Sequence, residues 1–193
     1  QKQALTHGMT LKDATAYNIQ FLEGRPVLID TLSFTTHEEN RPWVAYQQFC
    51  RHFLAPLLLM RYRDVRLNQL SRLHIDGVPL DIASELLPWR TRLSFSIQSH
   101  IHLHAKFLSR HASTRGRKQS RAGSVTISQT GLSGLLDNLE SLVGGLTYRM
   151  RSSEWSDYYS DTNYTERGLK HKLELTQRFI DQAKARRVWD IGA

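Results

Sequence analysis

One stretch, residues 11–30 with the sequence LKDATAYNIQFLEGRPVLID, constrains the fold of this chain more than any other. Two short apolar runs flank a turn at residues 23–26, a pattern that predicts a β-hairpin. Asp13 and Asn18 stand in the loop before the hairpin, and Asp30 ends its second strand. We expect these three polar side chains to converge on one point.

Phosphoryl transfer uses such a set, in which one Asp orients the attacking hydroxyl while an Asn and a second Asp hold Mg²⁺. The spacing of Asp13 and Asn18 matches that of the base and the metal ligand in a kinase catalytic loop. Asp30 follows at the position of the second metal ligand. The sequence therefore predicts Asp13 as a base, Asn18 and Asp30 as Mg²⁺ ligands, and Mg-ATP as a possible cofactor.

This pattern resembles the C-terminal lobe of protein-kinase-like and aminoglycoside-phosphotransferase-like folds, with Leu-Lys-Asp in place of His-Arg-Asp. The resemblance covers roughly residues 5–110. The sequence has no Gly-rich phosphate loop and no upstream strand Lys, and Asp30-Thr31-Leu32 lacks the Gly of Asp-Phe-Gly. The alternative is an Asx-type turn, a hairpin and a strand-end Asp with structural roles only.

The last residues, VWDIGA, follow a helical stretch and resemble the first strand and glycine turn of a class I S-adenosylmethionine (SAM)-dependent methyltransferase. Three upstream segments, LKDATAYN…IDTLSF, PWVAYQQFCRHFLAPLLL and EWSDYYSDTNYTERGLKHK, resemble a bacterial family of such enzymes related to nodulation (host-specificity) proteins. The resemblance implies that Asp190 and Gly192 begin a SAM site whose remainder follows Ala193. It also implies an unidentified small-molecule or glycan methyl acceptor.

The expected fold class is α+β and mainly helical: a kinase-like C-lobe with a small β-hairpin, then helices that lead into a truncated Rossmann-like methyltransferase domain. The predicted parts are a kinase-like helical domain (1–109, hairpin 19–29), a basic flexible linker (110–125), a helical connector (126–187) and the start of the methyltransferase domain (188–193). We expect the chain to be a piece of a longer protein.

Apolar periodicity and breaker residues predict the helices of these parts. Pro56 should kink or split a helix over 43–60, and Pro88 should stop a short helix over 80–87. A further helix is expected over 91–108. A helix from Leu132 to Leu146 should be capped by Thr130 or Ser133. Another helix should be capped by Thr165 and have an apolar face from Leu169 to Ala183. A strand is predicted to begin at Val188.

The net charge of +8 is concentrated in one segment. Residues 110–121 carry five basic side chains and no acidic one, without aromatic residues for base stacking. We interpret them as a solvated linker, so nucleic acid is not an expected partner. Cys50 is the only cysteine and no apolar run is long enough to span a bilayer, which favours the cytoplasm and no membrane contact.

Two further clusters have a functional and a structural interpretation. His100, His102 and His104 suggest a metal site, but satisfied surface or buried histidines are the favoured interpretation because no carboxylate has a companion spacing. The aromatic residues of the loop before Thr165 either line a substrate pocket or dock the loop against the core. They are Trp155, Tyr158, Tyr159 and Tyr164.

Together these patterns predict the upstream accessory, substrate-recognition region of a SAM-dependent methyltransferase, without catalysis of its own. A kinase-like, ATP- and Mg²⁺-dependent small-molecule phosphotransferase is one alternative. A basic nucleic-acid-binding module is the other.

Overall fold

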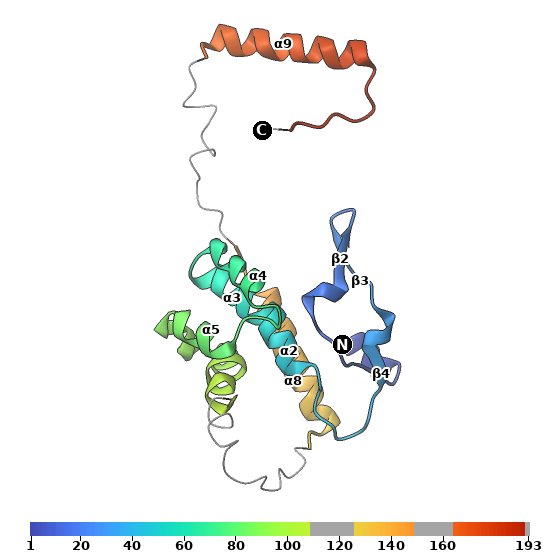
Figure 1. The fold of residues 1–193 in the computed structure, drawn as a ribbon, viewed down its shortest axis with the longest axis vertical. Helices are drawn as coiled ribbons and strands as arrows, with labels where there is room; N and C mark the ends of the chain where they lie inside the picture. The colour runs from blue at the N-terminus through green and yellow to red at the C-terminus, as the bar shows by residue number, and fades with distance from the viewer. Residues whose placement is uncertain (109–125, 149–163, 192–193) are drawn as a thin grey trace. The chain divides into compact units, whose positions relative to one another are not determined.

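The computed structural model describes residues 1–108, 126–148 and 164–191, and it divides the chain into two compact units, Gln1–Tyr148 and Arg149–Ala193 (Figure 1). The first unit combines many short helices with two small antiparallel sheets, and the described part of the second is dominated by one long helix. The expectation of a mainly helical α+β chain is confirmed.

Both sheets of the first unit have two strands and are formed by the N-terminal part of the chain. Strands β2 and β3 form an antiparallel hairpin, which confirms the one predicted for residues 19–29. Strands β1 and β4 pair around it, so the two ends of the loop-hairpin segment lie side by side. The elements of this part are α1 (Lys2–Thr6), β1 (Met9–Leu11), a 3₁₀ turn (Ala16–Asn18), β2 (Ile19–Leu22), β3 (Arg25–Leu28), a 3₁₀ turn (Thr31–Ser33) and β4 (Phe34–Thr36).

The hairpin turn consists of two residues, Glu23 and Gly24, with positive φ angles of 51° and 77°. Two consecutive residues in this region are typical of the tight turns that match the twist of antiparallel strands. Gly24 adopts this angle without a steric cost, whereas the side chain of Glu23 makes it unfavourable there. The turn is shorter than predicted, since Arg25 and Pro26 already belong to β3.

Helices α2 (Tyr46–Phe49) and α3 (Ala55–Tyr62) are joined by a π-helical turn, Cys50–Leu54. Pro56 is the second residue of α3, two positions after this turn. A proline has no N–H to donate and its ring crowds the carbonyl one turn earlier, so a widened turn at this place accommodates it. The predicted interruption at Pro56 thus takes the form of a π-helical turn.

The chain then forms a series of short helices that end where breaker residues occur. The helix predicted to stop at Pro88 is confirmed as α5 (Leu80–Leu86). The region predicted as one helix over 91–108 begins later, because a 3₁₀ turn ends at Leu93 and Ser94 caps the helix that follows. The other elements are a 3₁₀ turn (Val65–Gln69), α4 (Leu70–Leu73), the 3₁₀ turn (Trp89–Leu93), α6 (Phe95–Ile97), a π-helical turn (Gln98–Leu103) and a helical stretch at 104–108.

Helix α8 (Gln129–Gly144) belongs to the first unit and lies beside α2 in Figure 1. Its buried residues Leu132, Leu136 and Leu139 join the hydrophobic core, as the apolar spacing predicted. The compact unit therefore extends past the boundary expected at residue 109. The prediction of Thr130 or Ser133 as the cap is wrong, because the hydroxyl of Ser128 accepts the hydrogen bond from Gly131 N.

The core of the first unit unites side chains from helices far apart in sequence. Aliphatic residues of α3 and of the helices around residue 100 fill its centre, and α8 covers one side. Its largest fully buried apolar side chains are Leu54, Leu58, Leu59, Val78, Ile97, Ile101 and Leu132.

In the second unit, α9 (Glu166–Ala183) starts at the predicted cap, where the hydroxyl of Thr165 accepts a hydrogen bond from Gly168 N. None of its residues is buried. The strand predicted to begin at Val188 is a wrong prediction for the described residues, since 188–191 have no regular structure. A strand needs a neighbour to satisfy its backbone groups, and the described part of the chain provides none there.

Candidate functional site

The buried hydroxyl of Ser33 brings two of the three predicted site residues together. It accepts a hydrogen bond from Asn18 Nδ2 at 2.9 Å and donates one to Asp30 Oδ2 at 2.7 Å. Ser33 itself is 1% exposed. Asn18 and Asp30 therefore converge, as expected, but on a hydroxyl group of the chain itself.

Asp30 is held on both carboxylate oxygens. Its Oδ1 accepts a hydrogen bond from Leu32 N at 2.9 Å, so the residue caps the 3₁₀ turn Thr31–Ser33. Mg²⁺ requires oxygen ligands directed at one point. The side chain of Asn18 presents its amide nitrogen, not its oxygen, to Ser33, so these contacts do not themselves form a Mg²⁺ site.

Asp13 lies at the start of the same loop and has a local partner. Its Oδ1 accepts a hydrogen bond from Thr15 N at 3.0 Å, which is an Asx-type turn. The next residue, Ala14, donates its N–H to Gln48 Oε1 at 2.6 Å and ties the loop to the helical region. Among the described residues Asp13 makes no hydrogen bond to Asn18 or Asp30, so the structure brings together only two members of the predicted set.

The pairing of β1 with β4 fixes the position of this loop. Lys12 N donates to Ser33 O at 2.8 Å, directly beyond the ladder position at which Leu11 faces Phe34. The indole N–H of Trp43 donates to Leu11 O at 2.7 Å. These bonds anchor the loop to a strand on one side and to the core on the other.

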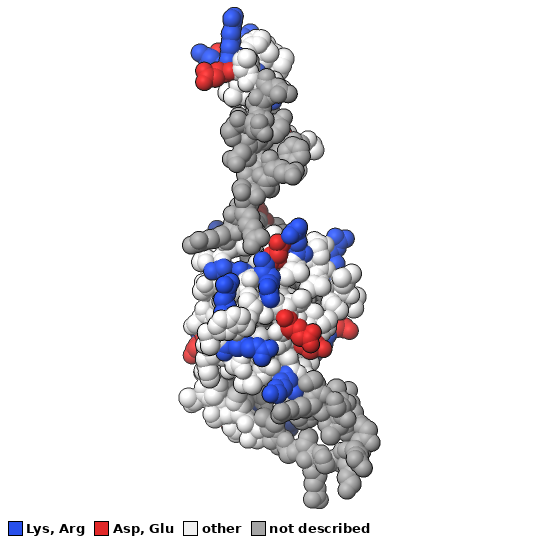
Figure 2. Space-filling view, turned by 90° about the vertical axis from the view of Figure 1, so that its left-hand side faces the viewer, with Lys and Arg blue, Asp and Glu red and all other residues white. Residues whose placement is uncertain are grey.

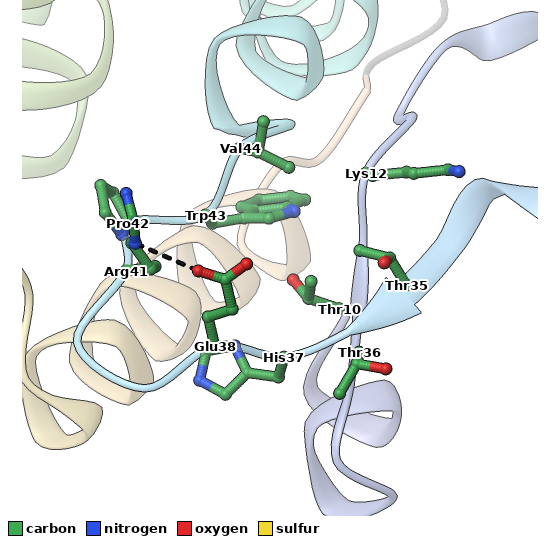
Figure 3. A pocket seen from close by; sticks show the side chains of 10 residues that line it. All are labelled: Thr10, Lys12, Thr35, Thr36, His37, Glu38, Arg41, Pro42, Trp43 and Val44. Atoms are coloured by element: carbon green, nitrogen blue, oxygen red, sulfur yellow. Dashed lines mark ion pairs between the residues drawn. The ribbon is translucent and has the colours of Figure 1, made fainter.

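A cavity of about 690 Å³ opens between these strands and the segment that leads to α2 (Figure 3). Threonine hydroxyls from β1 and β4 line one wall, and Trp43 lines another. Glu38 and Arg41, also in the wall, form an ion pair at 3.2 Å that neutralises both charges. Lys12 and His37 also line it. The cavity thus offers hydroxyl groups, an aromatic ring and one further cation, a lining that suits a polar ligand.

The three histidines form part of the core network. The ring nitrogens of His100 lie 2.7 Å from the Tyr46 hydroxyl and 2.9 Å from Asn138 Oδ1, and those of His102 lie 2.8 and 2.9 Å from two hydroxyls. His104 stacks on the Tyr46 ring at 5.1 Å. Burial lowers the pKa of all three imidazoles. Within the described ranges no group of His, Cys, Asp and Glu has the arrangement of a metal site, so the structural interpretation is favoured.

The other predicted residues are largely outside the described part of the chain. Asp190 is described and exposed, and Gly192 lies outside. The basic linker and three of the four loop aromatics also lie outside, and Tyr164 is exposed next to α9. Of the SAM-like motif residues Asp190 and Gly192, only Asp190 belongs to the described part of the chain.

Sequence reasoning missed Ser33 and Gln48. The spacing of Asp30 and Ser33, three residues apart at the end of a strand, is a signal for a capped turn and could have identified the bridge. Gln48 had no such signal, because its contact with Ala14 depends on how the loop and the helix meet.

The whole chain is similar to a known bacterial protein. Over all 193 residues it is 32% identical to "Nodulation protein NoeA" of Rhizobium meliloti (strain 1021). It resembles a nodulation protein from end to end. The chain spans 40% of the length of that relative, so most of the relative has no counterpart here.

No protein-family model matches the chain, and no solved structure matches it. In the described parts of the chain, no helix is both long and apolar enough to cross a membrane.

Proposed function

We propose that this chain is the substrate-recognition region of a nodulation-related, SAM-dependent methyltransferase and that it does not catalyse methyl transfer alone. The observation that carries the proposal is the similarity to NoeA along the whole chain, combined with the 40% coverage of that relative. The methyltransferase-like motif around Asp190 and Gly192 supports the same proposal.

Helix α9 supports a role as a connector. Its apolar residues Leu173 and Phe179 are 64% and 66% exposed, although an amphipathic helix gains most of its stability from a covered apolar side. Such a helix suits a segment that packs against a domain outside the described residues. In the proposed protein this would be the methyltransferase domain.

The Ser33 bridge supports recognition or scaffolding over phosphotransfer. The hairpin between Asn18 and Asp30 agrees with a kinase-like C-lobe, which we retain as part of the proposal. The bonds that occupy both Asp30 oxygens give this pair a structural role. The cavity in Figure 3, lined by threonine hydroxyls and Trp43, is a suitable site for a polar part of a small-molecule or glycan acceptor.

The decisive experiment measures SAM binding by the full-length protein. We expect micromolar binding that Gly192→Val weakens at least tenfold, because a side chain in the glycine turn blocks the approach of the cofactor to the backbone. Gly134→Val is the matched control, since a side chain at this exposed helical position meets nothing within 4 Å. A full-length protein that binds no SAM would rule the proposal out.

The alternative of a small-molecule phosphotransferase is favoured by one observation, the convergence of Asn18 and Asp30. Titration of residues 1–193 with Mg-ATP separates the two functions. We expect no heat of binding. Micromolar affinity that Asp30→Asn abolishes would favour phosphotransfer instead.

The nucleic-acid-binding alternative receives no comparable support from the described residues. On the face of the first unit in Figure 2, basic side chains are interspersed with acidic ones. A phosphate backbone favours a continuous basic surface. The nucleic-acid-binding alternative is tested by measuring how the binding of generic DNA depends on salt concentration, for the chain with and without residues 110–121.

A further inference from the structure

A second cavity, of about 510 Å³, lies in the first unit on the helix side of the loop that carries Asp13. The loop contributes Lys12 and Tyr17, the helical region contributes Arg51 and His52, and the turn before α5 contributes Asp76. Its size is that of a site for a small ligand. Lys12 also lines the cavity in Figure 3, but only here does Arg51 join it, so this cavity has two cations without an ion pair among the described residues.

Two cations of this cavity lack a paired carboxylate. Within the described ranges neither Lys12 nor Arg51 forms an ion pair, and Asp76 is the only acidic residue among those that line the cavity. The Arg51 guanidinium donates from Nη2 to Gly77 O at 3.3 Å, and its buried Nε has no acceptor. A buried donor without an acceptor is costly, so the guanidinium retains capacity for an anionic ligand.

The turn before α5 holds Arg51 in place. Val78 N donates to Arg51 O at 2.9 Å. A Cβ atom at Gly77, which has a φ of +81°, would lie 2.8 Å from the carbonyl carbon of Arg51, so only glycine allows this close approach. The backbone that carries the guanidinium is therefore fixed before any ligand arrives, which reduces the entropic cost of binding.

The remaining wall combines an imidazole with an aromatic ring. Tyr17 and His52 meet edge to face, with ring centroids 5.9 Å apart. Burial, reinforced by the positive charge of Arg51, lowers the pKa of His52, while the carboxylates of Asp13 and Asp76 act in the opposite direction. The imidazole is consequently neutral near pH 7 and available to donate or accept one hydrogen bond.

We propose that this cavity binds a small ligand through an oxyanion, a carboxylate or a phosphate group, held by Arg51 and Lys12 with the Tyr17 ring beside its less polar part. Arg51 supplies a planar fork of donors that fits either group, and Lys12 adds a second charge. The proposal goes beyond methyl transfer and does not depend on it. Its evidence is the lining of the cavity alone.

The test is an NMR titration of the ¹⁵N-labelled chain at low ionic strength with inorganic phosphate, glucuronate and glucose. We expect saturable shifts near Gln47 and His52, with a millimolar dissociation constant, for at least one of the two anions and none for glucose. The anion that binds more tightly identifies phosphate or carboxylate as the recognised group. No saturable shift with either anion, or equal binding of glucose, would overturn the proposal.

Variants locate the binding at the proposed cations. Lys12→Gln and Arg51→Gln should each weaken anion binding at least tenfold, and Arg72→Gln, an exposed arginine of α4, should leave it unchanged. Lys12 is exposed, so Lys12→Gln should fold normally. It therefore still tests the proposal if Arg51→Gln impairs folding. Retained binding in Lys12→Gln and in a folded Arg51→Gln would refute the assignment.

Discussion

Ser33→Ala isolates the contribution of the bridge between Asn18 and Asp30. The hydroxyl donates one hydrogen bond to a carboxylate, a type that contributes about 1.5–3 kcal/mol, and accepts one from a neutral amide, a type that contributes about 0.5–1.5 kcal/mol. Asn18 and Asp30 are half-buried, so water replaces part of both bonds. We expect the free energy of unfolding to fall by about 2 kcal/mol, which is about thirtyfold in the folding equilibrium.

The assay is urea unfolding of the chain followed by its tryptophan fluorescence, to which Trp43 of the first unit, 7% exposed, contributes together with three other tryptophans. Ser99→Ala is the matched control, because among the described residues the Ser99 hydroxyl bonds only to Phe95 O, one turn earlier in the chain. This control should change the free energy of unfolding by less than about 0.5 kcal/mol. Equal effects of the two substitutions would refute a structural role of the bridge and reopen the metal-binding interpretation of Asp30.

Three further predictions concern stability and reactivity. Gly77→Ala should destabilise the chain by about 2–4 kcal/mol in urea unfolding, and Gly24→Ala by only about 1 kcal/mol. Both glycines have a positive φ, but of the two only Gly77 would place its new Cβ atom 2.8 Å from backbone, at the carbonyl carbon of Arg51. Burial raises the pKa of the Cys50 thiol to about 12, so a thiol reagent should label it only after denaturation; rapid labelling of the native chain would contradict this. Burial lowers the pKa of His100 and His102 below their ordinary 6.5, so the unfolded chain binds more protons than the folded chain in this pH range. The urea midpoint should therefore fall as the pH decreases from about 7 to about 5. An unchanged midpoint would contradict this prediction.

Local signals explain which elements could be predicted. The hairpin follows from a glycine turn between two apolar runs, and α5 ends at a proline. Helix α9 begins at Thr165 because a hydroxyl cap satisfies an amide that the first helical turn leaves unpaired. Each of these depends on residues within a few positions of one another, so the sequence alone contains the required information.

The candidate site was predictable only in part. The spacing of Asn18 and Asp30 around the hairpin correctly indicated that they converge. It did not indicate that Ser33 stands between them, since the spacing of two residues does not show which third side chain bonds to both. The carboxylate of Asp13 closes a turn with Thr15 N, a local contact that its spacing to Asn18 does not reveal.

The sequence by itself determined the hairpin, the Thr165 cap of α9 and the placement of polar residues around residues 11–30. Only the tertiary structure decided that α8 joins the core, that residues 188–191 lack a strand partner among the described residues, and that Lys12 and Arg51 line one cavity. Turns, caps and periodicity are short-range effects of the backbone. Burial and the convergence of charges arise between segments far apart in the chain, and no local pattern records them.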